Sequence, residues 1–133
     1  MTRTIARLVL AAFYAVAGML HIVMPLPFLT IMPGWVPYPT TVIAFTGSAE
    51  IAGAIALAQP FSLTLRKAGG IGLALYAVCV FPANINHFAL DMARADHGLG
   101  VVYHIPRMFA QPLLIWLALW AGGVTDWPFR RRR

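Results

Sequence analysis

The chain has few of the residues on which soluble proteins rely for their surface and their chemistry. Of 133 residues, 11% are charged, four are acidic and one is a cysteine. The single Cys79 excludes an internal disulfide and a Cys-x-x-Cys pair, so dithiol chemistry within one chain is excluded. With 60% apolar residues, the chain has too little polar side chain to cover a water-soluble globule. The composition therefore predicts a single domain that lies in a lipid bilayer.

The positive charge does not indicate a nucleic-acid-binding protein. The formal net charge is +6, but four of the ten basic residues form the terminal run Arg130 to Arg133. A run at the end of a chain is typical of a topology anchor that meets anionic lipid headgroups, rather than of a folded basic patch. We therefore expect the lipid bilayer, and no nucleic acid, as a partner.

Four apolar stretches approach the roughly 20 residues that a helix needs to cross a bilayer. They run over about residues 5–24, 40–58, 68–90 and 106–123 of a single membrane domain, 1–133, with 124–133 as a basic cytoplasmic tail. Each should be a helix, because backbone groups in hydrocarbon must be satisfied within the segment. The sequence predicts an all-α, four-transmembrane-helix bundle. Alternatively, residues 1–17 resemble a cleaved signal peptide, and cleavage would leave three helices.

Basic residues are distributed unevenly between the two sides of this bundle. An N-terminus on the inside places eight Lys and Arg residues in the cytoplasm and leaves Arg94 and Arg107 outside. This bias predicts a multi-pass protein of the cell inner membrane with both termini in the cytoplasm.

The loop over residues 25–39, between the first two spans, contains five prolines and no charge. It cannot be helical throughout, because proline removes backbone donors and limits helix continuation. Its apolar side chains would be poorly placed in water. Either this outer loop folds back onto the bundle as a lid, or it is a tight connector whose prolines stop two helices.

Glu50 is the only glutamate, and it lies about eleven residues into the second span. This places it roughly 16 Å along the helix, near the membrane midplane. An ionised carboxylate is costly there, so the side chain should face the bundle interior, be protonated or have a polar partner. We interpret Glu50 as a candidate proton-handling or ligand-binding group. The alternative is a protonated glutamate that only links helices.

Further polar residues lie towards the outer ends of the spans. In the third span, Pro82 should kink the helix, and Asn84 and His87 share a face. His21 lies near the outer end of the first span. We therefore predict that His21, Glu50, Asn84 and His87 form an outward-opening ligand site, and we assign none of them to a metal ion.

Four sequence blocks resemble the DoxX-like family of small four-helix integral membrane proteins. They are Ala17-Gly18-Met19-Leu20-His21 with Pro25 and Phe28, Pro33-Gly34-Trp35-Val36-Pro37, Gly47-Ser48-Ala49-Glu50-Ile51-Ala52-Gly53, and Phe81-Pro82-Ala83-Asn84-Ile85-Asn86-His87. The resemblance implies a four-helix bundle and marks the same four candidate residues. It does not imply one activity, because relatives accompany oxidoreductases or act as assembly factors. The paired cysteines of thiol-redox relatives are absent here.

Three functions follow as hypotheses. The first is a redox-associated accessory subunit that binds a quinone-like lipophile and acts with a membrane oxidoreductase or as a homo-oligomer. The second is a noncatalytic membrane scaffold or assembly factor. The third, a b-type haem protein with His21 and His87 as axial ligands, has no spacing motif in its support.

Overall fold

The computed structural model describes residues 2–129, and every regular element in that range is a helix. The helices are α1 (Thr2–Val23), α2 (Leu26–Thr30), α3 (Pro39–Ala58), α4 (Leu63–Ala93) and α5 (Gly100–Gly122). The all-α prediction is confirmed, but the described range contains five helices, because the Pro-rich loop forms the short α2. The basic run Arg130 to Arg133 lies outside the described residues.

Two helices are longer than the hydropathy predicted. α4 begins at Leu63 instead of residue 68, because the Ser62 hydroxyl caps it by accepting a hydrogen bond from the backbone N–H of Leu65 at 3.2 Å. It continues through Pro82 to Ala93. α5 begins six residues before the predicted start at Pro106, so this proline lies inside the helix. Apolar runs alone missed these helix ends, because the added turns contain polar residues.

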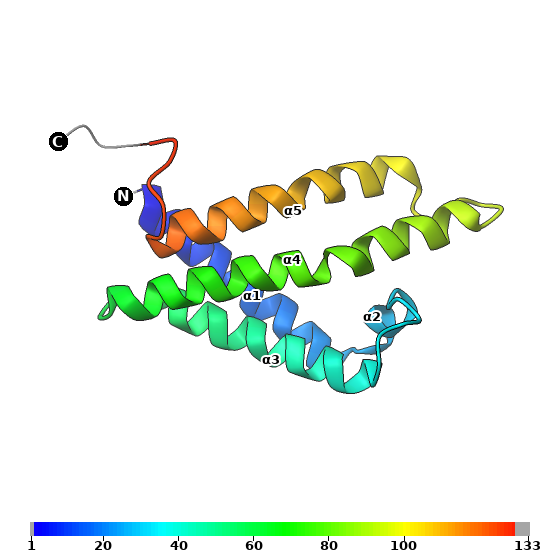
Figure 1. Cartoon of the computed structure of the whole chain (residues 1–133), viewed down its shortest axis with the longest axis horizontal. Helices are drawn as coiled ribbons and strands as arrows, with labels where there is room; N and C mark the ends of the chain where they lie inside the picture. The colour runs from blue at the N-terminus through cyan, green and yellow to red at the C-terminus, as the bar shows by residue number, and fades with distance from the viewer. Residues whose placement is uncertain (1, 130–133) are drawn as a thin grey trace.

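The four long helices lie alongside one another as a bundle, as Figure 1 shows. α1 packs on α3, α3 on α4 and α4 on α5, while α1 also contacts α5. We call the end where α1 begins and α5 ends the proximal end, and the opposite end, which carries α2, the distal end (Figure 1).

Glycine allows close helix contacts at several crossings. A Cβ atom on Gly18 of α1 would lie 2.5 Å from the Gly47 carbonyl oxygen of α3, and one on Gly70 of α4 would lie 2.6 Å from the Ala118 carbonyl oxygen of α5. Such contacts let backbones approach, as is typical of membrane helix interfaces. The buried core between them is largely aliphatic, with Leu57 and Leu73 almost fully enclosed.

The surface of the bundle is apolar. Large side chains such as Val9, Phe45 and Phe109 are exposed. Within the described chain, three helices, α1, α3 and α4, are long and apolar enough to cross a membrane. We expected four such spans, but α5 is not among the helices that are both long and apolar enough. It carries His104, Arg107 and Gln111 in its first half. The three apolar helices indicate insertion into a membrane.

The Pro-rich loop folds back over the distal end of the bundle. The Asn86 side-chain amide donates a hydrogen bond to the Ile31 carbonyl oxygen at 2.9 Å. The Phe28 ring stacks on the His21 ring, with 3.8 Å between centroids. Of the two alternatives for this loop, the structure shows the lid.

Candidate functional site

A cavity of about 460 Å³ lies beneath this lid, bordered by α1, α3, α4 and α5. Apolar side chains form most of its wall, as in many small-molecule sites. The polar residues that line it are Tyr14, His21, Thr46, Glu50, Tyr76, Asn84, Arg107 and Gln111. Three of the four residues predicted from the sequence, His21, Glu50 and Asn84, therefore border one space.

His21 and Glu50 meet at the wall of this cavity. The His21 Nδ1 atom lies 2.8 Å from the Ala17 carbonyl oxygen and 2.9 Å from the Glu50 Oε2 atom. Because a carbonyl oxygen only accepts, Nδ1 must carry a hydrogen, which it donates to Ala17. Glu50 Oε2 is near the ring nitrogen, but it has no hydrogen bond of good geometry to any described residue. The carboxylate thus keeps hydrogen-bonding capacity.

Two tyrosines flank this carboxylate. Tyr14 and Glu50 are each 2% exposed, and the Tyr14 hydroxyl has no hydrogen-bond partner among the described residues. Tyr76 lies beside Glu50 from α4. A buried polar group without a partner costs about 1–3 kcal/mol, so native structures rarely leave two together. The cluster is suited to a ligand that supplies the missing hydrogen bonds.

Two buried amides border the same cavity. Asn84 of α4 and Gln111 of α5 are both buried and both line its wall. Arg107, one helical turn before Gln111, also borders the cavity. A ligand there would meet carboxylate, amide, phenol and guanidinium groups in an otherwise apolar wall.

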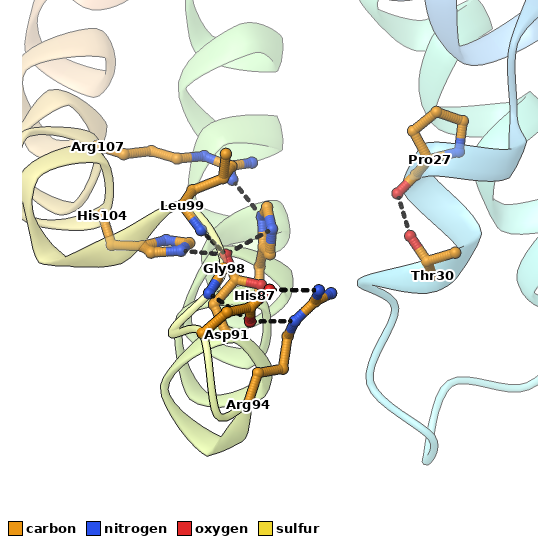
Figure 2. A network of polar contacts seen from close by, with 10 residues as sticks. Pro27, Thr30, His87, Asp91, Arg94, Gly98, Leu99, His104 and Arg107 are labelled. Atoms are coloured by element: carbon orange, nitrogen blue, oxygen red, sulfur yellow. Dashed lines mark hydrogen bonds and ion pairs between the residues drawn. The ribbon is translucent and has the colours of Figure 1, made fainter.

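His87, the fourth predicted residue, belongs to a different polar network, which Figure 2 shows. It does not line the cavity. Arg107 donates a hydrogen bond from Nη1 to His87 Nδ1 at 2.8 Å, and His87 Nε2 lies 3.5 Å from Asp91 Oδ2. The same Asp91 oxygen accepts from the Leu99 backbone N–H at 3.0 Å and from His104 Nε2 at 2.9 Å. This network joins α4 to α5 at the distal end.

Three side chains of this network could hold a metal ion. One donor atom each from His87, Asp91 and His104 lie within 4.8 Å of one another, and His/carboxylate sets are common ligands of zinc and iron. However, Arg107 can only donate, so its contact makes His87 Nδ1 an acceptor and leaves the hydrogen on Nε2. A metal ion would need the lone pair of His87 Nε2, which carries this hydrogen. Metal binding would therefore require Arg107 to leave His87.

The two histidines of the haem hypothesis have different neighbours in the structure. His21 stacks on Phe28 and contacts Glu50, whereas His87 contacts Arg107 and Asp91. Two axial ligands must approach one iron from opposite sides. The two rings have different polar partners, and the haem hypothesis stays a prediction.

Sequence reasoning missed several members of both clusters, although helical spacing carried a signal. Tyr14 precedes His21 by seven residues, and Gln111 follows Arg107 by four, so each shares a helix face with its neighbour. Asp91 likewise follows His87 by four. No comparable spacing pointed to Tyr76, because its partner Glu50 is on another helix.

Comparison with known proteins gives one match. No curated protein and no solved structure is similar enough to the chain to count as a match. A family model described as a domain of unknown function (DUF8561) matches residues 10–123. This range includes both polar clusters at the distal end. The chain therefore belongs to the family of the domain of unknown function DUF8561.

Proposed function

We propose that this protein binds a lipophile with a polar, hydrogen-bonding head, such as a quinone, in the distal cavity. The observation that carries the proposal is a pair of buried polar atoms, Glu50 Oε2 and the Tyr14 hydroxyl, which have no hydrogen bond of good geometry among the described residues and lie beside a largely apolar cavity. A quinone oxygen accepts a hydrogen bond from a phenol or a protonated carboxyl group, and a quinol hydroxyl donates one to a carboxylate.

A second, largely apolar groove supports a ligand with a hydrocarbon tail. It has a volume of about 530 Å³ and lies between α1 and α5. Phe13 and Leu114 line both this groove and the cavity. A head in the cavity could therefore continue as a tail along the α1–α5 seam, where a lipophile would enter from the bilayer.

Glu50 is the candidate proton-handling residue in this proposal. One of its titratable neighbours is His21, whose Nδ1 atom lies 2.9 Å from Glu50 Oε2. A carboxyl group beside an imidazole can exchange a proton with a bound quinol. We assign no turnover to the protein, and an accessory role beside a membrane oxidoreductase, or as a homo-oligomer, rests on the DoxX-like sequence blocks.

The same proposal includes the membrane topology. We propose α5 as the fourth span, because its 23 residues pack along α4. Arg3, Arg7, Arg66 and Lys67 at the proximal end favour the inner membrane with that end in the cytoplasm. Reporter fusions near Pro60 and at the C-terminus should read inside, and fusions near Gly34 or His97 outside. An outside signal at the C-terminus would reverse the orientation.

Decylubiquinone, a quinone with a ten-carbon tail, is a suitable probe of the cavity. Trp35 lines the cavity, whereas Trp116, Trp120 and Trp127 do not. Binding should therefore quench the fluorescence of Trp35 in a saturable way, and Trp35→Phe should lose most of this signal. Native mass spectrometry from mild detergent would show whether a small molecule is already bound.

The decisive variant is Glu50→Gln, which keeps the shape and removes the ionisation. We expect the affinity for decylubiquinone to fall about tenfold, which corresponds to about 1.4 kcal/mol. Ser48→Ala on the same helix is the control, because its exposed hydroxyl donates to the Ala44 carbonyl. If the wild type neither retains a small molecule nor binds the probe saturably, the binding proposal fails and the scaffold hypothesis becomes the better explanation.

A further inference from the structure

Two arginines at the proximal end each have a buried Nε atom without a hydrogen bond to any described residue. Arg7 of α1 is 7% exposed, and its Nε atom has no partner among the described residues. The Nε atom of Arg66, in the first turns of α4, is buried and likewise without a partner there. In contrast, Arg3 donates to the Trp120 and Thr125 carbonyl oxygens and to Asp126.

None of the acidic side chains between residues 2 and 129 is free to neutralise these two cations. The chain has four acidic residues. Glu50 faces the distal cavity, Asp91 and Asp96 lie in or beside the distal network, and Asp126 binds Arg3. Because a buried charge is costly without a partner, and two like charges near each other add to that cost, a bound anion would stabilise this pair of arginines.

A small pocket lies where such an anion would bind. It has a volume of about 120 Å³ and is lined by Arg3, Thr4, Arg7, Leu63, Arg66, Ala121, Gly122 and Gly123. It lies where α1 and α4 begin and α5 ends, at the proximal end in Figure 1. The first turns of α1 and α4 add the positive ends of two helix dipoles.

We propose that Arg7 and Arg66 bind a phosphate group in this pocket. Guanidinium groups match phosphate oxygens through paired N–H donors, and the negative charge of a phosphate offsets the mutual repulsion of the two cations. The group can belong to the headgroup of an anionic phospholipid, since the pocket lies at the ends of membrane-length helices, or to free inorganic phosphate. The site is separate from the distal cavity and does not depend on the ligand proposed there.

Thermal unfolding of the full chain in a neutral detergent tests this site. Phosphatidylglycerol should raise the unfolding temperature by about 4 °C or more at saturation, and phosphatidylcholine should not. Inorganic phosphate at millimolar concentration is the third arm. A shift with phosphatidylglycerol alone identifies a lipid headgroup, and an equal shift with inorganic phosphate identifies the free anion.

Three single substitutions separate the site from general charge effects. Arg7→Gln and Arg66→Gln should each abolish most of the shift. Lys67→Gln removes the same charge from the exposed neighbour of Arg66, and this variant should keep the shift in unfolding temperature. Without added anion, Arg7→Gln should unfold at no lower temperature than the wild type, because it removes an uncompensated buried charge. This result would show that the lost response is not caused by misfolding.

Two results would overturn the proposal. One is a wild type whose unfolding temperature responds to neither phosphatidylglycerol nor phosphate. The other is a Lys67→Gln protein that loses the shift to the same extent as Arg66→Gln, which would mean that the lipid responds to net positive charge rather than to the pocket.

Discussion

The proximal and distal halves of the bundle use the same helices in different ways. In the proximal half, α4 and α5 touch through backbone, with Gly70 against Ala118 and Gly122. In the distal half, side chains from the same two helices, such as Asn84 and Gln111, border a cavity. Small residues thus allow the helices to pack closely in the proximal half, while larger polar residues line a cavity in the distal half. The comparison suggests that stability depends on the proximal half and binding on the distal half.

The largest effect is expected from filling the α4–α5 contact. In Gly70→Val, the new Cβ atom would lie 2.6 Å from the Ala118 carbonyl oxygen, and backbone cannot move aside as a flexible side chain can. We expect a loss of about 3 kcal/mol in the free energy of unfolding. Unfolding by denaturing detergent, followed by circular dichroism, would measure it.

Gly72→Val is the matched control, two residues further along α4. A Cβ atom at Gly72 meets nothing within 4 Å, so the bundle should tolerate the valine. Equal destabilisation by the two substitutions would show that helix propensity, rather than the close contact, decides the result.

The next effect concerns the unpartnered phenol of the distal half. Tyr14→Phe removes a buried hydroxyl that has no hydrogen bond to any described residue. The free energy of unfolding should therefore stay unchanged or rise, while the affinity for decylubiquinone should fall about fivefold to tenfold, or about 1–1.4 kcal/mol. Fluorescence titration and thermal unfolding of the same samples would measure both quantities.

The opposite outcome for Tyr14→Phe would count against the assignment of binding to the distal half. If the protein is destabilised and still binds the probe as well as the wild type, the hydroxyl serves packing. Tyr103→Phe is a useful control, because this tyrosine contacts His87 and Arg107 and does not line the cavity.

A smaller effect is expected from loosening the lid. Asn86→Ala removes the hydrogen bond from the side-chain amide to the Ile31 carbonyl oxygen. The loss of one such bond, about 1 kcal/mol, should raise the dissociation rate of decylubiquinone about fivefold. Stopped-flow recovery of Trp35 fluorescence would report the rate. Thr30→Val, which removes a bond within the loop to Pro27, should leave it nearly unchanged.

The sequence was sufficient to place Glu50 inside the bundle. One glutamate at mid-span in an apolar helix has to avoid lipid, and the structure shows it 2% exposed, beside His21. The cavity itself could not be predicted, because its walls come from four helices and a loop whose relative rotation depends on glycine contacts such as Gly18 with Gly47.

The position of His87 shows where helical spacing misleads. Residues three apart are separated by about 60° around a helix, so Asn84 can face the cavity while His87 faces α5. Asp91, one turn further on, and Arg107, on the other helix, decide its direction. One sequence by itself does not show which residues of α4 and α5 contact each other.

The smallest effect lies outside the spans, in the loop that joins α4 and α5. Arg94 contacts Asp96 with N–O distances of 2.9 and 3.1 Å, and the Gly98 backbone N–H donates to the same carboxylate at 3.1 Å. Hydrogen bonding to Arg94, aided by Gly98, lowers the pKa of Asp96 to about 2. This is below the ordinary aspartate value of about 3.9, so the folded state binds fewer protons than the unfolded chain between these values.

The lowered pKa fixes the sign of the pH dependence. The contribution of Asp96 to stability is complete above about pH 4 to 5 and is lost as the pH falls through about 2. Asp96→Asn should therefore lower the unfolding temperature at pH 7 by about 1 °C, since exposed ion pairs contribute little, and the difference from the wild type should vanish near pH 2. Arg94→Gln should reproduce this trend. A deficit in Asp96→Asn that persists unchanged at pH 2 would instead assign the effect to the turn geometry of the loop, because protonation would then have no influence on it.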